Sequence, residues 1–220
     1  MCYSEIKNIY KGFYRYLNMN KTLRIYEILY KKYGSQNWWP VSGSNSEFEI
    51  IVGAILAQNT NWKNVEKSIK NLKDNNLLDK DAIKNIELEK LTGLIKSSGY
   101  YKQKARKLKE FVNFEGAINR DNLLGIWGIG PETADSILLY AYNQPVFVID
   151  AYTKRIFTRL GFKLDNYDEY QEYFHKNLLK DCKLFNEYHA LLVELAKKHC
   201  KSEPLCDDCP LLKECKQKAL

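Results

Sequence analysis

The chain has 220 residues, of which 45% are hydrophobic and 28% charged, and its formal net charge is +7. This composition can bury the core of one domain or two small ones, excludes a disordered chain, and is compatible with a nucleic-acid partner. No apolar run reaches the roughly 20 residues of a membrane-spanning helix, and no secretory signal begins the chain, so we expect an intracellular protein without a membrane partner.

Almost every segment of the chain has apolar residues at helical spacing. The segment 21–34 ends at a glycine, and 46–60 begins at Ser46, a typical N-cap, and is apolar enough to be buried. Alternating strand patterns are missing, so we expect an all-α protein of about ten helices. The remaining helical segments are 61–74, 87–100, 100–114, 120–130, 131–143, 168–179 and 183–200, and residues 146–161 are a short apolar run that leads into another helix.

Residues 125–135, GIWGIGPETAD, join two of these helical segments. Gly128 and Gly130 permit a tight turn with exposed N–H groups, which form an anion site with the start of the next helix. Pro131 suits the first turn of that helix, and Glu132 stands where the helix dipole favours an acid. The alternative is an ordinary glycine-containing turn between packed helices.

Asp150 follows the apolar run VFVI and precedes a helix. An aspartate at this position is a good N-cap, and the helix N-terminus keeps its carboxylate ionised. An ionised carboxylate also stabilises a sugar oxocarbenium ion and orients a water molecule. The structural and catalytic interpretations of Asp150 are therefore compatible.

Four of the six cysteines lie close together near the C-terminus. One Cys-x2-Cys pair with a single cysteine on either side favours a [4Fe–4S] cluster, since zinc sites usually use two such pairs. Zinc remains the alternative, and in either case the metal would stabilise the loop. The predicted ligands are Cys200, Cys206, Cys209 and Cys215.

Together, the hairpin, the following aspartate and the four-cysteine loop resemble the endonuclease III superfamily of DNA glycosylases. SSGYYKQKARKL resembles the helix before the hairpin, and AILAQNT resembles the segment that carries a DNA-wedging glutamine, here Gln58. The likeness extends from about Ser46 to Cys215. One departure is the first cysteine gap, which holds five residues where relatives commonly have six.

This resemblance implies two helical lobes with a DNA-binding cleft between them. Residues 41–147 would form a six-helix barrel with the helix–hairpin–helix, and 1–40 plus 148–220 a second lobe with the cluster loop. The expected partner of the monomeric protein is double-stranded DNA with a damaged base, flipped out of the helix.

The resemblance also implies roles for single residues. Asp150 would be the catalytic carboxylate, and Gln58 would fill the space left by the flipped base, although a plain helix terminus also explains it. Gly128, Ile129 and Gly130 would hold DNA phosphates. Lys104, in a basic helical segment, would reach a phosphate unless that segment is a solvated face.

Bifunctional members carry a lysine two residues past the second hairpin glycine, where this chain has Glu132. A carboxylate cannot form an imine with the sugar, so the sequence predicts a monofunctional glycosylase that uses water as nucleophile. Glu132 is assigned to the substrate site on this resemblance. The alternative is a solvent-facing acid in the first turn of the helix.

We predict that the excised base is an alkylated purine such as 3-methyladenine. The prediction rests on residues 37–40, NWWP, and on residues 52–55, which lack the acid of adenine-excising relatives. Trp38, Trp39 and Pro40 resemble the base pocket of bacterial 3-methyladenine glycosylases, which lack the cluster. Indole faces stack well on a cationic alkylated purine. The alternative for the two tryptophans is packing in a core or between the lobes. The alternatives for the protein are a thymine or uracil mismatch glycosylase and a non-catalytic helix–hairpin–helix DNA-binding protein.

Overall fold

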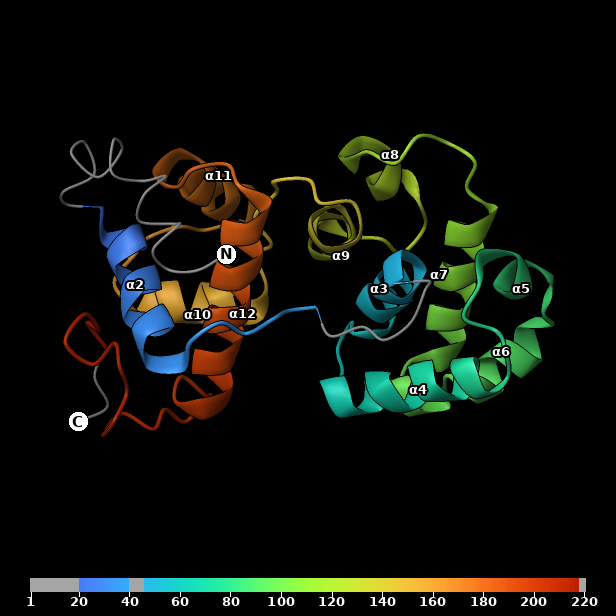
Figure 1. Ribbon diagram of the computed structural model, residues 1–220, viewed down its shortest axis with the longest axis horizontal. Coiled ribbons are helices and arrows are strands. Elements are labelled where there is room, and N and C mark those ends of the chain that lie inside the picture. Colours follow the sequence, from blue (N-terminus) through green and yellow to red (C-terminus); the bar gives the residue numbers. More distant parts are fainter. Residues whose placement is uncertain (1–19, 40–45, 218–220) are drawn as a thin grey trace. The chain divides into compact units, whose positions relative to one another are not determined.

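The structure is a computed structural model that describes residues 20–39 and 46–217. Within these ranges the chain is helical and has no β-strand, which confirms the expected all-α class (Figure 1). No helix in the described ranges combines the length and the apolar character that crossing a membrane demands. Pro40 and the side chain of the expected N-cap Ser46 lie outside the described residues.

Backbone contacts divide the chain into two compact units. We call Trp39–Gln144 the hairpin unit, and Met1–Trp38 together with Pro145–Leu220 the terminal unit. The two adjacent tryptophans of the NWWP segment therefore belong to different units. The resemblance had suggested boundaries after residues 40 and 147.

The hairpin unit is built around one buried helix, α3 (Ser46–Leu56), whose residues Ile51, Val52 and Ile55 are at most 2% exposed. This helix contacts three neighbouring helices and a π-helical turn, η2 (Ile137–Ala141). The other elements are α4 (Trp62–Asp74), α5 (Lys80–Asn85), α6 (Leu88–Leu94), η1 (Lys96–Ser98), α7 (Tyr101–Asn113), α8 (Arg120–Gly125) and α9 (Pro131–Ser136).

Two segments expected to be single helices are interrupted. Residues 87–100 form α6 and then the 3₁₀ turn η1, and α9 continues into the π-helical turn η2. Such π-helical turns are frequent at functional sites. Helix α5 was not expected, and the side chain of Asp79 caps it by accepting from the N–H groups of Asp81 and Ala82.

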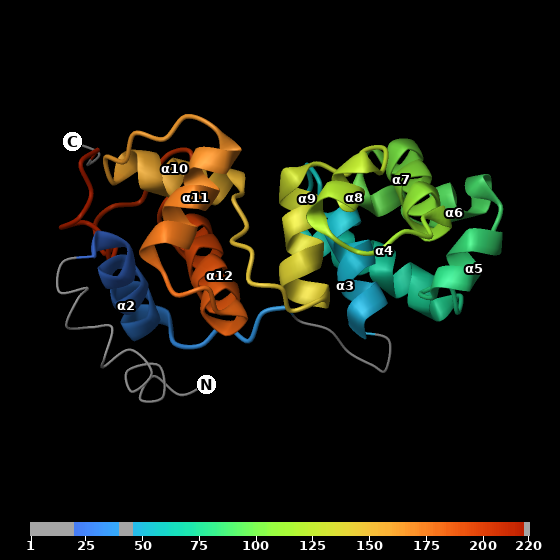
Figure 2. The same ribbon diagram turned by 90° about the horizontal axis from the view of Figure 1, so that it is seen from above.

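Within its described residues, the terminal unit packs four helices around an aromatic core: α2 (Lys21–Tyr33), α10 (Ala151–Arg159), α11 (Tyr167–Asn177) and α12 (Cys182–Lys198). Helix α12 runs beside α2 and α10 (Figure 2). Phe147 stacks on Phe174 with ring centroids 3.8 Å apart, and Tyr188 donates a hydrogen bond of 2.7 Å to the Thr22 carbonyl. These buried rings connect the segment before α10 with α11 and α12.

Candidate functional site

The turn between α8 and α9 is fixed by its apolar residues. Ile126 and Ile129 point inward, at 6% and 4% exposed, and the Ile129 N–H closes the turn with a 3.0 Å hydrogen bond to the Ile126 carbonyl. Gly128 has a φ of 82°, a left-handed backbone conformation that favours glycine. A Cβ there would lie 2.5 Å from a methylene of Lys107. The expected turn is therefore a defined hairpin.

The hairpin leaves two backbone donors available. Among the described residues, the N–H groups of Gly128 and Gly130 donate no hydrogen bond to the protein, and Pro131 begins α9 directly after them. Exposed amides beside a helix N-terminus suit an anion such as phosphate. Ile129 differs from the expectation, because its N–H serves the turn and its side chain is buried.

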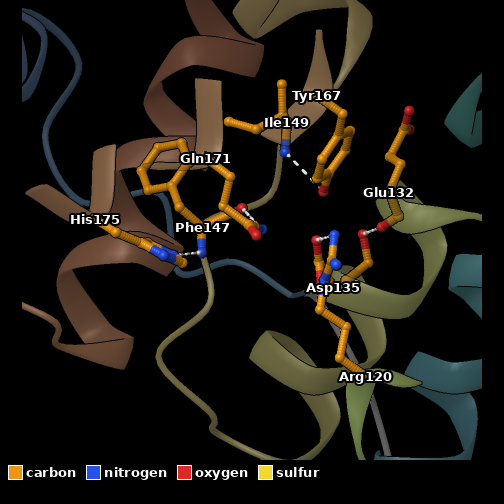
Figure 3. Close-up of polar contacts among 9 residues, drawn as sticks. Arg120, Glu132, Asp135, Phe147, Ile149, Tyr167, Gln171 and His175 are labelled. Carbon is orange, nitrogen blue, oxygen red and sulfur yellow. Dashed lines mark hydrogen bonds and ion pairs between the residues drawn. The ribbon is translucent and has the colours of Figure 1, made fainter. Parts of the chain in front are cut away.

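Glu132 lies exposed in the first turn of α9, where the Ser136 hydroxyl donates a 2.7 Å hydrogen bond to its carbonyl (Figure 3). One turn later Asp135 is fully buried and accepts hydrogen bonds of 2.9 and 3.4 Å from the Arg120 guanidinium. This ion pair joins α8 to α9 across the hairpin. The sequence analysis missed it, because neither residue belongs to a recognisable motif.

Gln58 follows α3 and is bound to the hairpin. Its amide nitrogen donates to the Gly128 carbonyl at 3.2 Å and to the Thr133 hydroxyl at 2.8 Å, and its amide oxygen accepts from the Lys107 ammonium. Gln58, which was predicted to enter the DNA, is therefore hydrogen-bonded to the hairpin that was predicted to bind the phosphates. Its role as a wedge stays a prediction.

Lys104 has a different role from the expected phosphate contact. Its side chain is 1% exposed, and its ammonium donates to the carbonyls of Leu56 at 2.9 Å and Ser98 at 2.5 Å. Burial, and next the charge of Lys107, lower its pKa to about 8. Lys104 is a buried cation that joins α7 to α3 and η1, and Lys107 is the lysine of α7 that lies at the hairpin.

A second cation near the hairpin was also missed. Trp127, in the turn itself, is 44% exposed, and the Arg106 guanidinium lies 4.0 Å from the centre of its ring. A cation held over an indole face is stabilised by the ring quadrupole. The pair presents a positive charge and a flat apolar surface next to the two free amides.

Trp39 forms an aromatic group with Trp62 and Tyr140 in the hairpin unit. Its ring centroid is 5.0 Å from that of Trp62, edge to face, and 5.2 Å from that of Tyr140, which lies on the π-helical turn η2. Gly53 of α3 allows this approach, since a Cβ there would lie 2.9 Å from the Trp39 ring. The tryptophans are half-buried, whereas Tyr140 is 6% exposed.

Trp38 belongs to the terminal unit, where the Lys197 ammonium lies 5.7 Å from the centre of its ring. The sequence had grouped Trp38 with Trp39 as walls of one pocket. The division between the two units falls between them.

Asp150 is the N-cap of α10 and accepts a hydrogen bond of 2.7 Å from the Thr153 N–H. Its other oxygen lies 3.6 Å from Nε2 of the buried His189, on α12, and 13% of its side chain is exposed. Burial raises the pKa of Asp150, but His189 and Thr153 lower it by more, so the net pKa is below its ordinary value. The carboxylate is therefore ionised at neutral pH.

Comparison with known proteins places this geometry in a family. The model of the HhH-GPD superfamily of base excision DNA repair proteins matches residues 52–180, which include the hairpin and Asp150. The chain belongs to this superfamily. The expected membership is thereby confirmed, and with it base excision repair by a DNA glycosylase that carries a helix–hairpin–helix and binds DNA.

Two relatives of this HhH-GPD protein carry different names. A Methanocaldococcus jannaschii protein, named provisionally as a DNA repair glycosylase, is 47% identical over 89% of this chain and 96% of its own. Endonuclease III of Thermotoga maritima is 30% identical over 76% of this chain and 82% of its own.

Among solved structures, an H. pylori 3-methyladenine DNA glycosylase bound to 1,N6-ethenoadenine has a TM-score of 0.73 and 30% identity, over 80% of this chain and 97% of that one. A trapped endonuclease III–DNA covalent intermediate has a TM-score of 0.76 but 24% identity, over 90% and 97%. The second likeness shows the fold alone.

The C-terminal loop of this HhH-GPD protein has donors suited to an iron–sulfur cluster. Its four cysteines are half-buried and free of disulfides. Burial, and then the charges of the other three sulfurs, raise the pKa of Cys209 against the lowering effect of the Leu211 N–H. Across the described residues, no three His, Cys, Asp or Glu side chains gather closely enough for a metal ion.

Two arginines of α10 hold this loop. Arg155 donates to the Cys200 carbonyl at 2.8 Å, and Arg159 donates to the Cys200 sulfur at 3.2 Å and the Lys201 carbonyl at 2.6 Å. The Cys215 thiol donates to the Arg159 carbonyl at 3.4 Å. N–H groups that point at sulfur stabilise thiolates, so the chemistry of these donors suits a thiolate-bound cluster, although the four sulfurs are not gathered around one centre in the described residues.

Proposed function

We propose that this protein is a monofunctional DNA glycosylase, which hydrolyses the N-glycosidic bond of an alkylated purine such as 3-methyladenine and leaves the DNA strand intact. The observation that carries the proposal is Glu132, an exposed acid in the first turn of α9. It occupies the position at which bifunctional members of the superfamily carry their lysine. Glu132 has no amine with which to form a Schiff base.

Asp150 supplies the charge for hydrolysis. As the purine leaves with the bonding electrons, positive charge develops on the sugar, and an ionised carboxylate stabilises it. A water oxygen then bonds to C1′ and its proton passes to Asp150 or to solvent. The N-cap hydrogen bond and His189 support this role, because both keep the carboxylate ionised and oriented.

The aromatic group of Trp39, Trp62 and Tyr140 supports a cationic purine as the excised base. Aromatic faces attract a positively charged ring, and such a base leaves without prior protonation by an acid. We also assign Trp38 and Pro40 to the substrate site on the resemblance. The 30% identity to a 3-methyladenine DNA glycosylase points in the same direction.

The remaining parts bind DNA and stabilise the fold. The free amides of Gly128 and Gly130 are proposed to hold a phosphate, with Gln58 as the wedge. Cys200, Cys206, Cys209 and Cys215 would hold a [4Fe–4S] cluster, whose binding adds folding energy to the loop. We expect an intracellular monomer that acts on duplex DNA with a damaged base.

The test is base release from duplexes that each carry one modified base, followed by gel analysis with and without alkali. The expected product is an intact abasic strand that breaks only in alkali, and borohydride should trap no covalent adduct. Asp150→Asn should retain the cap and DNA affinity but lose about 10²–10³-fold in rate.

Three results would contradict parts of the proposal. A trapped adduct with the unmodified protein would show an amine nucleophile and a bifunctional enzyme. Release of thymine or uracil from mismatches, without release of methylated purines, would establish the mismatch alternative. DNA binding without release of any base would leave the non-catalytic alternative.

A further inference from the structure

The segment that leads into Asp150 lies outside every helix, although its residues are buried. Phe147, Val148 and Ile149 are at most 1% exposed, and they lie in no helix. Buried backbone N–H and C=O groups need hydrogen-bond partners, which a neighbouring strand usually provides. The described part of the chain has no β-strand, so the partners must come from elsewhere.

Helix α11 provides them with three side chains spaced one turn apart: Tyr167, Gln171 and His175 (Figure 3). His175 Nε2 accepts from the Phe147 N–H at 3.0 Å, and Gln171 donates to the Phe147 carbonyl at 2.9 Å. The Tyr167 hydroxyl accepts from the Ile149 N–H at 3.3 Å. Residues four apart share one face of a helix, so α11 binds the segment as a strand would.

The attachment fixes where Asp150 lies along the chain. Phe147 is bound through both backbone polar groups, and its ring stacks on Phe174 of α11. A slip of the segment would break these bonds, and it would also move Asp150 away from Thr153 and His189. The position of the carboxylate therefore depends on α11 as well as on its own helix.

We propose that Tyr167, Gln171 and His175 are positioning residues for the Asp150 carboxylate. The inference rests on the proposed catalytic role of Asp150. The three side chains act through the backbone of residues 147–149 and touch neither the base nor the sugar. Small displacements of a catalytic group lower the rate steeply, so the effect belongs to kcat and not to DNA affinity.

The test measures single-turnover base release and DNA affinity for variants of the full-length protein. Gln171→Glu removes the donor at nearly constant shape, and Tyr167→Phe removes only a hydroxyl. His175→Leu removes the acceptor, whereas His175→Gln replaces it with an amide oxygen. We expect Gln171→Glu and His175→Leu to lower kcat by about ten- to a hundredfold with little change in Kd, and His175→Gln to restore most of the rate.

Two controls separate positioning from general stability. Glu172→Gln, an exposed site on the same helix, should leave kcat unchanged. In the Asp150→Asn background, His175→Leu should cause little further loss, because a residue that acts through Asp150 then has no charge to position.

The inference is overturned if His175→Gln is as slow as His175→Leu, if Kd worsens in parallel with kcat, or if the losses with Asp150→Asn are simply additive. Full activity of Asp150→Asn would instead refute the proposed catalytic role of Asp150. Should His175→Leu fail to fold, Gln171→Glu and Tyr167→Phe decide the question by the same comparison.

Discussion

Lys104 and Lys107 lie one turn apart on α7, yet their surroundings differ. Lys104 is enclosed and bound to two carbonyls, whereas Lys107 lies against Gly128 and bonds to Gln58. The sequence could not separate them, because both belong to one basic amphipathic pattern. Their difference depends on which carbonyls α3 and η1 leave unpaired, and only the tertiary structure determines that.

Substitution by methionine should distinguish the two lysines. Lys104→Met leaves two buried carbonyls without a donor and should lower the free energy of unfolding by about 2–4 kcal/mol, without changing the salt dependence of DNA binding. Lys107→Met should reduce the slope of log K against log salt by about 1, because one cation near the hairpin is lost. Chemical denaturation and binding titrations at several salt concentrations measure both. Equal salt slopes for the two variants would refute the assignment.

The lowered pKa of Lys104 gives a second, pH-dependent prediction. The folded-state pKa of about 8 lies below the ordinary lysine value of 10.5, so between these pH values the unfolded chain binds the proton more tightly. Protonation of Lys104 therefore opposes folding, and this cost disappears as the pH rises through that interval. The stability advantage of the wild type over Lys104→Met should widen from pH 8 to pH 10 in parallel denaturation curves. A constant difference would contradict the pKa shift.

At the scale of elements, the helices and the hairpin could be predicted, but their partners could not. Apolar spacing indicated most helices, and GIWGIGP indicated the turn. The same reasoning could not detect the π-helical turn that carries Tyr140, because local residue patterns do not encode an added residue per turn. The sequence also could not single out the three side chains of α11 that bind residues 147–149, which are Tyr167, Gln171 and His175. The spacing of polar residues identifies one face of a helix, but it does not identify what that face binds.

The hairpin glycines provide a matched pair of substitutions. Gly128→Ala forces an alanine into φ 82° with its Cβ 2.5 Å from Lys107, and should cost about 1–3 kcal/mol of stability and weaken DNA binding. Gly130 has φ −95°, and a Cβ added there would meet no heavy atom within 4 Å, so Gly130→Ala should change stability by about 0.5 kcal/mol or less. Thermal unfolding of both variants tests this, and a larger loss for Gly130→Ala would contradict the geometry.

At the scale of the whole molecule, the terminal unit is made of two stretches that are distant in sequence, and the cysteine loop is tied to both. Arg24 of α2 pairs with Glu214 at 2.7 Å, and Arg159 of α10 holds Cys200 and Lys201. The cysteine spacing indicated a metal loop, but not which helices secure it. Loss of the proposed cluster should therefore weaken the packing of α2 and α10 as well as the loop.

Cys206→Ser tests this coupling, with Cys182→Ser as the control, since Cys182 begins α12 and lies outside the loop. The unmodified protein, prepared without oxygen, should contain about four irons per chain and a broad sulfur-to-iron absorption band. Cys206→Ser should lose iron, lower Tm by roughly 5–15 °C and weaken DNA binding. Because Asp150 lies at the opposite end of α10 from Arg159, base release at saturating protein should persist at a reduced rate. Stoichiometric zinc in a colourless protein would refute the cluster, and equal effects of Cys182→Ser would show that loss of any half-buried thiol suffices.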